Sequence, residues 1–294
     1  MHIALIGASG QLGTALNSAL AGTGTVTALT RKQIDIADAA SVVETLSSLK
    51  PDTVINAAAY NFVDRAEEEP EVAFAVNGLG PRNLALYCRR HDSILVHVGS
   101  DYVFSGMSTG EGAVRDTPYR ESDTPNPRSA YAVSKLAGES FVRAICSRHF
   151  VVRTCGLYGA ATSPGKGNFV KTMLRLAGER DELTVVDDQR CTPTSAADLA
   201  GWIARLIGTD VYGLYHATNS GSATWCEFAR EILRIAGIDV PVRPVTTAEF
   251  GAKAPRPIYS VLCCEKLETT LGVTFRPWQP ALADYVQAER SRGC

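Results

Sequence analysis

The chain opens with MHIALIGASGQLG at residues 1–13, and this stretch decides the fold. The first six residues predict a buried parallel strand, because their side chains are mostly apolar and no turn residue interrupts them. A helical pattern follows, with leucines at every fourth position, Leu12, Leu16 and Leu20. Strand, glycine-rich turn and helix in this order form the arrangement that a phosphate-binding turn requires.

Three glycines stand between the predicted strand and the predicted helix. We expect Gly7 to permit a tight turn, Gly10 to let the backbone approach a pyrophosphate, and Gly13 to let the helix pack close to the strand. The spacing is Gly-x-x-Gly-x-x-Gly rather than the more common Gly-x-Gly-x-x-Gly. An ordinary glycine-rich turn between a strand and a helix is the alternative interpretation.

Composition limits the classes of function that the chain could have. It has 294 residues, of which 45% are hydrophobic and 20% charged, and a net charge of −2, which gives no electrostatic case for binding nucleic acid or an anionic membrane. No apolar run is long enough for a membrane span, and no basic leader or cleavage site precedes the first strand, so we expect a cytoplasmic protein. The eight cysteines and five histidines are scattered without ligand spacing, which favours free thiols and predicts no metal site.

Alternating strand and helix patterns through the first half predict an α/β fold, a Rossmann-type doubly wound parallel sheet with a smaller C-terminal substrate lobe. We assign 1–155 to the NAD(P)-binding domain, with roughly 190–222 returning to it, and 156–189 and 223–294 to the substrate-binding lobe. Residues 66–90 are expected to contain a long helix, and a second helix is expected to open at 165–169.

Tyr131 and Lys135 lie four residues apart in a predicted helix, which places both side chains on one helix face. Ser100 stands at the end of the apolar run 94–98, another predicted strand. Brought together, the three residues could deliver a proton to a carbonyl, with the Lys135 charge lowering the pKa of Tyr131 and the Ser100 hydroxyl holding the carbonyl oxygen. Tyr-x-x-x-Lys alone occurs easily by chance, so the motif needs the cofactor turn as context.

Motifs along nearly the whole chain resemble the extended short-chain dehydrogenase/reductases, and among them the dTDP-4-dehydrorhamnose reductase family. The matching stretches are GASGQLG at 7–13, PDTVINAAAY at 51–60, DYVF at 101–104, YAVSKLAGE at 131–139, NFVK at 168–171, VVDDQ at 185–189 and RP at 256–257. The resemblance implies NAD(P)H-dependent reduction of the C4 keto group of a nucleotide-linked 4-keto-6-deoxy sugar, most simply dTDP-4-dehydro-L-rhamnose to dTDP-L-rhamnose.

The resemblance also implies a role for each matching residue. Tyr131 would give a proton to the sugar oxygen, Lys135 would hold the nicotinamide ribose, and Ser100, where the family usually has Thr, would bond the carbonyl. The residues implied to contact the cofactor are Gly7, Gly10, Gln11, Leu12, Gly13, Asn56, Ala57, Ala58, Tyr131 and Lys135. The residues implied to contact the substrate are Ser100, Asp101, Tyr102, Gly156, Asn168 and Arg256. Strand-end capping is the alternative for Asn56, and helix capping for Asn168.

Besides Ser100, three positions depart from the family pattern. Gly156 stands where the family commonly has Trp, and Cys191 where it commonly has Gly. Both are expected to flank the sugar, so we expect a reshaped sugar subsite that tolerates further 4-keto sugars. Ala15 stands where some members have an acidic residue that bridges a dimer through Mg2+, so no metal is expected.

The expected cofactor is NADPH, with NADH as a second possibility. The second predicted strand ends at Leu29 and is followed by Arg31 and Lys32, with no acidic residue before Asp35. Basic residues at this position favour the 2′-phosphate of NADP, while an acidic residue would favour the ribose of NAD. A merely solvated turn is the alternative for this basic pair.

Two further functions share this fold and stay open at this point. One is a non-catalytic nucleotide-binding regulatory subunit, as in the β subunit of methionine adenosyltransferase, which resembles the same family. The other is a nucleotide-sugar epimerase or dehydratase, although Ser100-Asp101 lacks the Asp-Glu pair expected of a dehydratase. A nucleotide sugar is the expected partner, neither nucleic acid nor membrane is, and a homodimer is a possible assembly.

Overall fold

A six-stranded parallel sheet forms the centre of the computed structural model, which describes residues 1–107, 113–161 and 167–292. The strand order is β10-β5-β4-β3-β1-β2. The strands are β1 (His2–Ile6), β2 (Thr25–Leu29), β3 (Thr53–Asn56), β4 (Ile94–Ser100), β5 (His149–Thr154) and β10 (Gly213–His216). The alternating sequence pattern therefore predicts the fold class correctly, an α/β sheet of Rossmann type.

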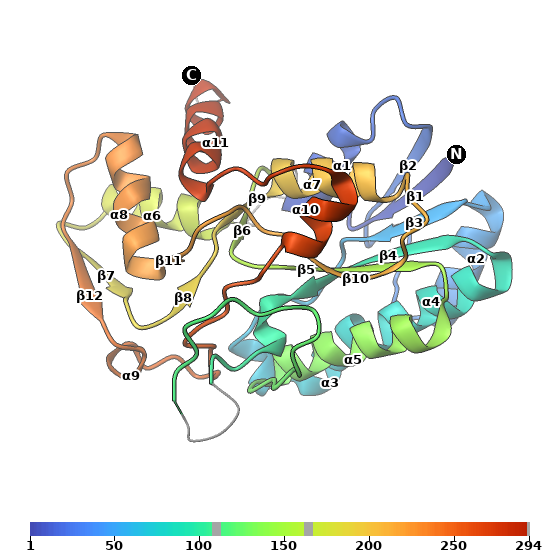
Figure 1. Ribbon diagram of the computed structural model, residues 1–294, viewed down its shortest axis with the longest axis horizontal. Coiled ribbons are helices and arrows are strands. Elements are labelled where there is room, and N and C mark those ends of the chain that lie inside the picture. The colour runs from blue at the N-terminus through green and yellow to red at the C-terminus, as the bar shows by residue number, and fades with distance from the viewer. Residues whose placement is uncertain (108–112, 162–166, 293–294) are drawn as a thin grey trace.

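Helices cover both faces of this sheet (Figure 1). One face packs against α1 (Gln11–Ala19), α7 (Ala196–Leu206) and α10 (Glu265–Leu271). The other packs against α2 (Ala39–Leu49), α4 (Gly80–His91) and α5 (Ala130–Ile145). Strands covered on both faces are expected to be buried along their length, as β1, β3 and β5 are, with apolar residues at their centres.

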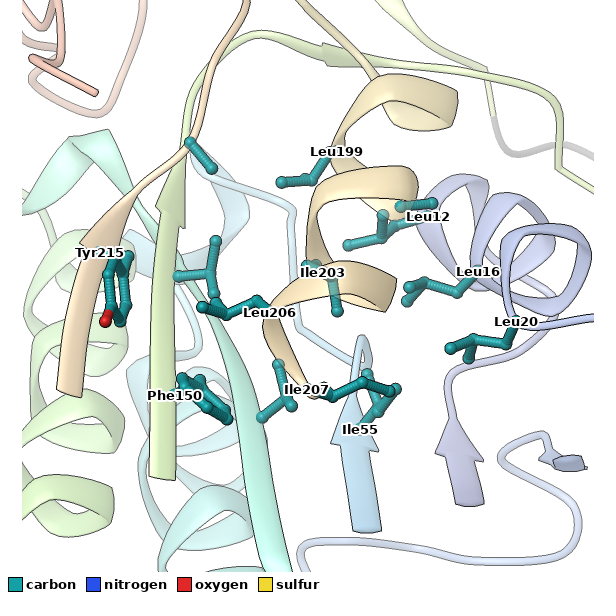
Figure 2. Packing of buried hydrophobic residues seen from close by; sticks show 14 of the residues in the cluster. Leu12, Leu16, Leu20, Ile55, Phe150, Leu199, Ile203, Leu206, Ile207 and Tyr215 are labelled. Atoms are coloured by element: carbon teal, nitrogen blue, oxygen red, sulfur yellow. The ribbon is translucent and has the colours of Figure 1, made fainter. Parts of the chain in front are cut away.

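The first face shows how the apolar pattern of the sequence becomes a core. Figure 2 shows leucines of α1 lying beside Leu199 and Ile203 of α7, above Ile55 of β3 and Phe150 of β5. Leu16, Leu20 and Leu199 are completely buried, as the spacing of four residues along the helix predicts for α1. Burying one such leucine stabilises the fold by about 1.5–3 kcal/mol.

The range 66–90 does contain a long helix, which runs from Pro70 to His91 as three consecutive elements and is preceded by a separate turn. The turn is the 3-10 turn η1 (Arg65–Glu67), and the three elements are α3 (Pro70–Phe74), the π-helical turn η2 (Ala75–Leu79) and α4. The break between the turn and the helix falls at Glu69, which has φ −131° and ψ 60° and precedes Pro70. The ring of a proline disfavours helical backbone in the residue before it, so the long helix starts only after this point.

A smaller layer of helices and short strands lies beside the sheet (Figure 1). Its core comes from α6 (Phe169–Ala177), α8 (Trp225–Ala236), α11 (Trp278–Arg292) and β7 (Leu183–Val186), which pairs with β12 (Val242–Val245). The remaining elements are η3 (Asp101–Val103), β6 (Leu157–Tyr158), β8 (Arg190–Cys191), β9 (Thr194–Ser195), β11 (Ala223–Thr224) and α9 (Thr247–Phe250).

The helix α10 departs from the predicted division into domains. Leu267 and Leu271 of α10 belong to the core of the main sheet, so this helix packs with the sheet although it falls within the lobe range 223–294. The division into domains otherwise stays a prediction. The helix expected to open at 165–169 begins at Phe169 in the structure, and residues 165 and 166 lie outside the described residues. No helix in the described part of the chain has the length and apolar character that a membrane span needs.

The glycine turn lies where the strand order reverses, since the chain leaves β1 first toward β2 and later returns on the other side at β3. Gly7 has φ +80°, and a Cβ there would lie 2.6 Å from the backbone nitrogen of Ala58, just after β3. A Cβ on Gly13 would overlap Gly7 and Ala8. In contrast, a Cβ on Gly10 would meet only the Gly7 carbonyl, at 3.3 Å. Gly7 and Gly13 are therefore required by packing, and Gly10 is free to serve a ligand.

Gly13→Ala should lower the free energy of unfolding by about 1–3 kcal/mol, because the added methyl group overlaps backbone that cannot move away easily. Urea denaturation measures the loss. Gly201→Ala is the matched control, since no atom lies within 4 Å of the added Cβ in α7. Alanine is the better helix former, so the control should be stabilised by up to about 1 kcal/mol. Equal stability of the two variants would contradict the packing role of Gly13.

Candidate active site

The structure brings the three predicted catalytic residues together at the carboxyl edge of the sheet. The side chain of Ser129 caps α5 by accepting a hydrogen bond from the Ala132 nitrogen at 3.2 Å, which fixes the start of the helix. Tyr131 then lies in the first turn and Lys135 in the next. The Tyr131 hydroxyl hydrogen-bonds with Ser100 at the end of β4. All three side chains are buried.

Burial dominates the protonation of the tyrosine and the lysine. It raises the pKa of Tyr131 to about 12, against a hydrogen bond between Tyr131 and Ser100, which lowers it. It lowers the pKa of Lys135 to about 8, against the nearby Glu139 charge, which raises it. The structure thus corrects the expectation that Lys135 brings the pKa of Tyr131 below its usual value. Tyr131 is a protonated phenol at neutral pH and is suited to donate a proton.

Asp101 is a buried carboxylate beside these groups. One oxygen accepts a hydrogen bond from the Ser100 hydroxyl at 3.3 Å, and the other accepts one from the Cys155 thiol at 3.0 Å. Burial raises the pKa of Asp101 to about 6, although these hydrogen bonds lower it. Because Ser100 also accepts from the Tyr102 nitrogen at 3.2 Å, its hydroxyl is held by the start of η3. Asp101 therefore orients Ser100.

A loop that follows β3 reaches the catalytic tyrosine through Asn61, a residue that none of the sequence motifs includes. The Tyr131 hydroxyl lies 3.5 Å from Oδ1 of Asn61. Asn77 in η2 holds the loop by accepting from the Tyr60 nitrogen at 2.8 Å and donating to the Tyr60 carbonyl at 3.0 Å. Tyr102 packs edge-on against Tyr131, with ring centres 5.7 Å apart. An amide in a loop at the carboxyl edge of a parallel sheet is the only signal that the sequence offers for Asn61.

The predicted cofactor residues lie around the point between β1 and β3 where the strand order reverses, which is where folds of this kind have their ligand crevice. Gly10 is the N-cap of α1, no side chain caps this helix, and its first turn has no acidic residue, so its positive end suits an anion. Ala57 and Ala58 pack against Gly7 and are partly exposed. Asn56 is buried, accepts from the Ala58 nitrogen at 3.1 Å and pairs with His97. Its side chain therefore shapes the turn after β3, which agrees with the interpretation of Asn56 as a residue that caps the end of the strand.

The basic pair after β2 is exposed. The side chain of Arg31 is 82% exposed and lies 3.8 Å from Asp35, which makes a weak ion pair in water. Lys32 is also exposed. Gly7 and Ala8 both donate to the Leu29 carbonyl, so the end of β2 borders the glycine turn. The two cations are therefore close to the crevice in the fold, and neither is committed to a strong partner among the described residues.

Two predicted substrate residues have protein partners. Arg256 forms a double ion pair with Asp64, at 3.0 and 2.8 Å, and the hydrogen bond from Arg256 lowers the pKa of Asp64. Asn168 caps α6 by accepting from the Lys171 nitrogen at 2.9 Å, while its amide nitrogen lies 3.0 Å from Gln11 and from Tyr285. The side chain of Asn168 thus acts as a helix cap in this structure, as the alternative interpretation expects. Through Gln11 and Tyr285, Asn168 also links the glycine turn to the lobe.

Gly156 and Cys191 lie on segments that meet beside the site. The Gly156 carbonyl accepts a hydrogen bond from the Thr194 nitrogen at 3.2 Å, and the Cys191 thiol hydrogen-bonds with Cys155. Gly156 has φ +53°, a conformation that side chains rarely adopt, and a Cβ there would lie 3.1 Å from the Thr192 carbonyl. Backbone conformation is therefore one reason for the glycine, and the reshaped sugar subsite stays a prediction.

The structure also describes the thiols and possible metal ligands. The seven cysteines within the described residues are free, and five of them are buried, while Cys294 lies outside that part. No group of three or more His, Cys, Asp or Glu side chains in the described ranges is arranged to hold a metal ion.

A glycine turn at the switch point and a buried Ser-Tyr-Lys group across the same crevice define a Rossmann-fold protein of the short-chain dehydrogenase/reductase class. A model of the family described as the RmlD substrate binding domain matches residues 1–291. The chain belongs to this family, which confirms the resemblance found in the sequence.

Relatives of known name cover the same length. A dTDP-4-dehydrorhamnose reductase of Streptomyces griseus is 42% identical and is matched over 95% of this chain and 90% of its own. The spore coat polysaccharide biosynthesis protein SpsK of Bacillus subtilis is 40% identical over 99% of both chains. Among solved structures, a Bacillus anthracis dTDP-4-dehydrorhamnose reductase in complex with NADP superposes with a TM-score of 0.90 at 38% identity, covering 97% of this chain and 98% of its own.

Asp101→Asn should stabilise the protein by an amount that grows with pH. The folded pKa of about 6 exceeds the ordinary value of 3.8, so ionisation of Asp101 destabilises the folded state as pH rises through this interval. The gain over wild type should be near zero at about pH 4 and about 2–3 kcal/mol at about pH 7. Urea denaturation at both pH values measures it. Asp116→Asn, at an exposed position, is the control, and an equal response of both variants would contradict the prediction.

Proposed function

We propose that this chain is an NADPH-dependent reductase that converts dTDP-4-dehydro-L-rhamnose to dTDP-L-rhamnose. The buried Ser100–Tyr131–Lys135 group, across the crevice from a helix N-terminus open to an anion, is the observation that carries the proposal. The names of the relatives that match nearly the full chain support the same substrate. Retention of all three catalytic side chains favours an enzyme over a regulatory subunit.

The residues of the crevice fit a nicotinamide dinucleotide. A Cβ on Gly10 would fill space beside the N-terminus of α1 where few protein atoms lie, and this end of the helix suits a pyrophosphate. Gly10, Gln11, Leu12 and Gly13 would hold the pyrophosphate, Ala57 and Ala58 would line the cleft, and Lys135 would hold the nicotinamide ribose. Arg31 and Lys32 would meet a 2′-phosphate, and the NADP complex of the Bacillus anthracis relative supports this preference.

The chemistry divides between the cofactor and three side chains. NADPH, when bound, supplies a hydride for the carbonyl carbon. Tyr131 donates its phenolic proton to the sugar O4, since burial keeps the phenol protonated at neutral pH. Ser100 donates a hydrogen bond to the same oxygen in place of Asp101. The ammonium of Lys135 then stabilises the phenolate that is left on Tyr131.

Location in the cytoplasm, a homodimer and the absence of nucleic-acid partners stay predictions. The epimerase alternative is not favoured, because the epimerase of Thermus thermophilus shares the fold at only 21% identity.

Tyr131→Phe tests the proposed function directly. The variant should fold and bind NADPH, yet its turnover of dTDP-4-dehydro-L-rhamnose should fall by roughly 10²-fold or more, because the proton donor is lost. Loss of NADPH absorbance on adding the sugar nucleotide measures turnover. Wild-type protein that binds NADPH but leaves this substrate unreduced would overturn the substrate assignment, and near-normal turnover in the variant would overturn the role of Tyr131.

Neutral replacements of both Arg31 and Lys32 should weaken NADPH binding by about tenfold or more and change NADH binding little. Only NADPH loses charge-assisted contacts to a phosphate. Fluorescence titration with each cofactor measures both dissociation constants. The matched control replaces Arg89 and Arg90, two exposed cations in the last turn of α4, and should alter neither. An equal loss for the two cofactors would show that the pair does not select between them.

A further inference from the structure

A buried ion pair lies one helical turn beyond the catalytic lysine. Arg153 of β5 donates from Nε at 2.9 Å and from Nη2 at 2.8 Å to a single oxygen of Glu139, Oε2. Both side chains are 1% exposed. Glu139 follows Lys135 by four residues on α5, so the two side chains share one face of the helix.

The second oxygen of this carboxylate is not used by the pair. Oε1 of Glu139 is buried without a hydrogen-bond partner and lies against Gly99, where a Cβ would overlap it. Lys135 Nζ donates to the carbonyl of Val98 at 2.7 Å. Gly99 thus makes room for the carboxylate beside the β4 residue that holds the lysine. A buried oxygen without a partner is rarely tolerated, which indicates a use for its charge.

Other ionisable groups face α5 from the elements packed against it. They are Glu67 of η1, Arg82 and Cys88 of α4, His97 of β4, Asp101 of η3 and Arg153 of β5. The charge of Asp101 acts on Tyr131 rather than on Lys135. Burial holds the pKa of His97 well below its usual value, so this ring is neutral at the pH where Lys135 titrates. Glu139 is the carboxylate that acts on Lys135.

We propose that Glu139 is a positioning residue that keeps the buried Lys135 positively charged at the pH where the protein works. The inference deepens the proposed function, since Lys135 would hold the ribose and stabilise the Tyr131 phenolate only as an ammonium ion. Arg153 holds the carboxylate in place by binding Oε2, and Oε1 is left without a hydrogen-bond partner beside Gly99, next to the Val98 carbonyl that binds the lysine. A purely structural ion pair would support the fold equally well and leave the titration of Lys135 unchanged.

The sign of the effect follows from the charges. Burial favours the neutral amine and lowers the pKa of Lys135, while the Glu139 carboxylate favours the ammonium and raises it. Removing the carboxylate should therefore lower the pKa of Lys135 further. As the pH rises, the variant should then lose the ammonium ion, and with it NADPH binding, at a lower pH than wild type does. Removing Arg153 instead takes away a positive charge and should not lower the pKa of Lys135.

The test compares Glu139→Gln, Arg153→Met and the double variant that carries both. Glu139→Gln alone leaves a buried guanidinium unpaired and is at risk of not folding, whereas the double variant buries no unpaired charge. NMR titration of isotope-labelled lysine in ligand-free protein, with the signal assigned by Lys135→Arg, gives the pKa of Lys135. Fluorescence titration of NADPH between about pH 6 and about pH 10 gives the pH at which binding weakens.

The double variant should show both midpoints about one pH unit below wild type, while Arg153→Met should stay at or above wild type. Glu265→Gln, which removes the same charge from an exposed pair with Arg120, should match wild type. An unchanged or raised midpoint in the folded double variant overturns the proposal. Failure of wild-type protein to bind NADPH would overturn the proposed function instead, and the NMR titration would still decide the role of Glu139.

Discussion

Close packing of the β1–α1 turn against the end of β3 is the constraint on which the site depends. Gly7 and Gly13 have no room for a side chain, so the turn lies directly on the backbone that follows β3. This contact sets the crevice at the point where the strand order reverses and aims the N-terminus of α1 into it. The loop that begins at Ala57 then continues from the same contact to Asn61, beside Tyr131.

Burial determines the protonation of the site, because it makes the ionisable groups sensitive to one another. Tyr131, Lys135 and Asp101 all have shifted pKa values, and burial is the largest cause for each. In a medium of low polarity, a single neighbouring charge or hydrogen bond changes a protonation equilibrium more than it would in water. The ion pair of Glu139 and Arg153 therefore acts on chemistry that neither residue contacts.

Local sequence patterns predicted the fold and the residues at the centre of the site. They did not predict contacts between side chains that are far apart in the sequence. The strand-glycine-helix order and the spacing of Tyr131 and Lys135 follow from backbone periodicity, which neighbouring residues encode. The bonds from Tyr131 to Asn61 and from Arg256 to Asp64 join residues far apart in the sequence, so only the folded chain reveals them. The pKa of Tyr131 was misjudged for the same reason, since spacing carries no information about burial.

The edge strand β10 and the covering helices α7 and α10 come from the second half of the chain, yet they complete the sheet begun by β1. During synthesis, β1 to β5 therefore leave the ribosome before α7 and α10, with one face of their sheet covered by α1 alone and Phe150 without its full set of neighbours. Complete packing of this face therefore has to wait for segments that are synthesised late. The same arrangement also means that no single cut divides the chain into two pieces with complete cores.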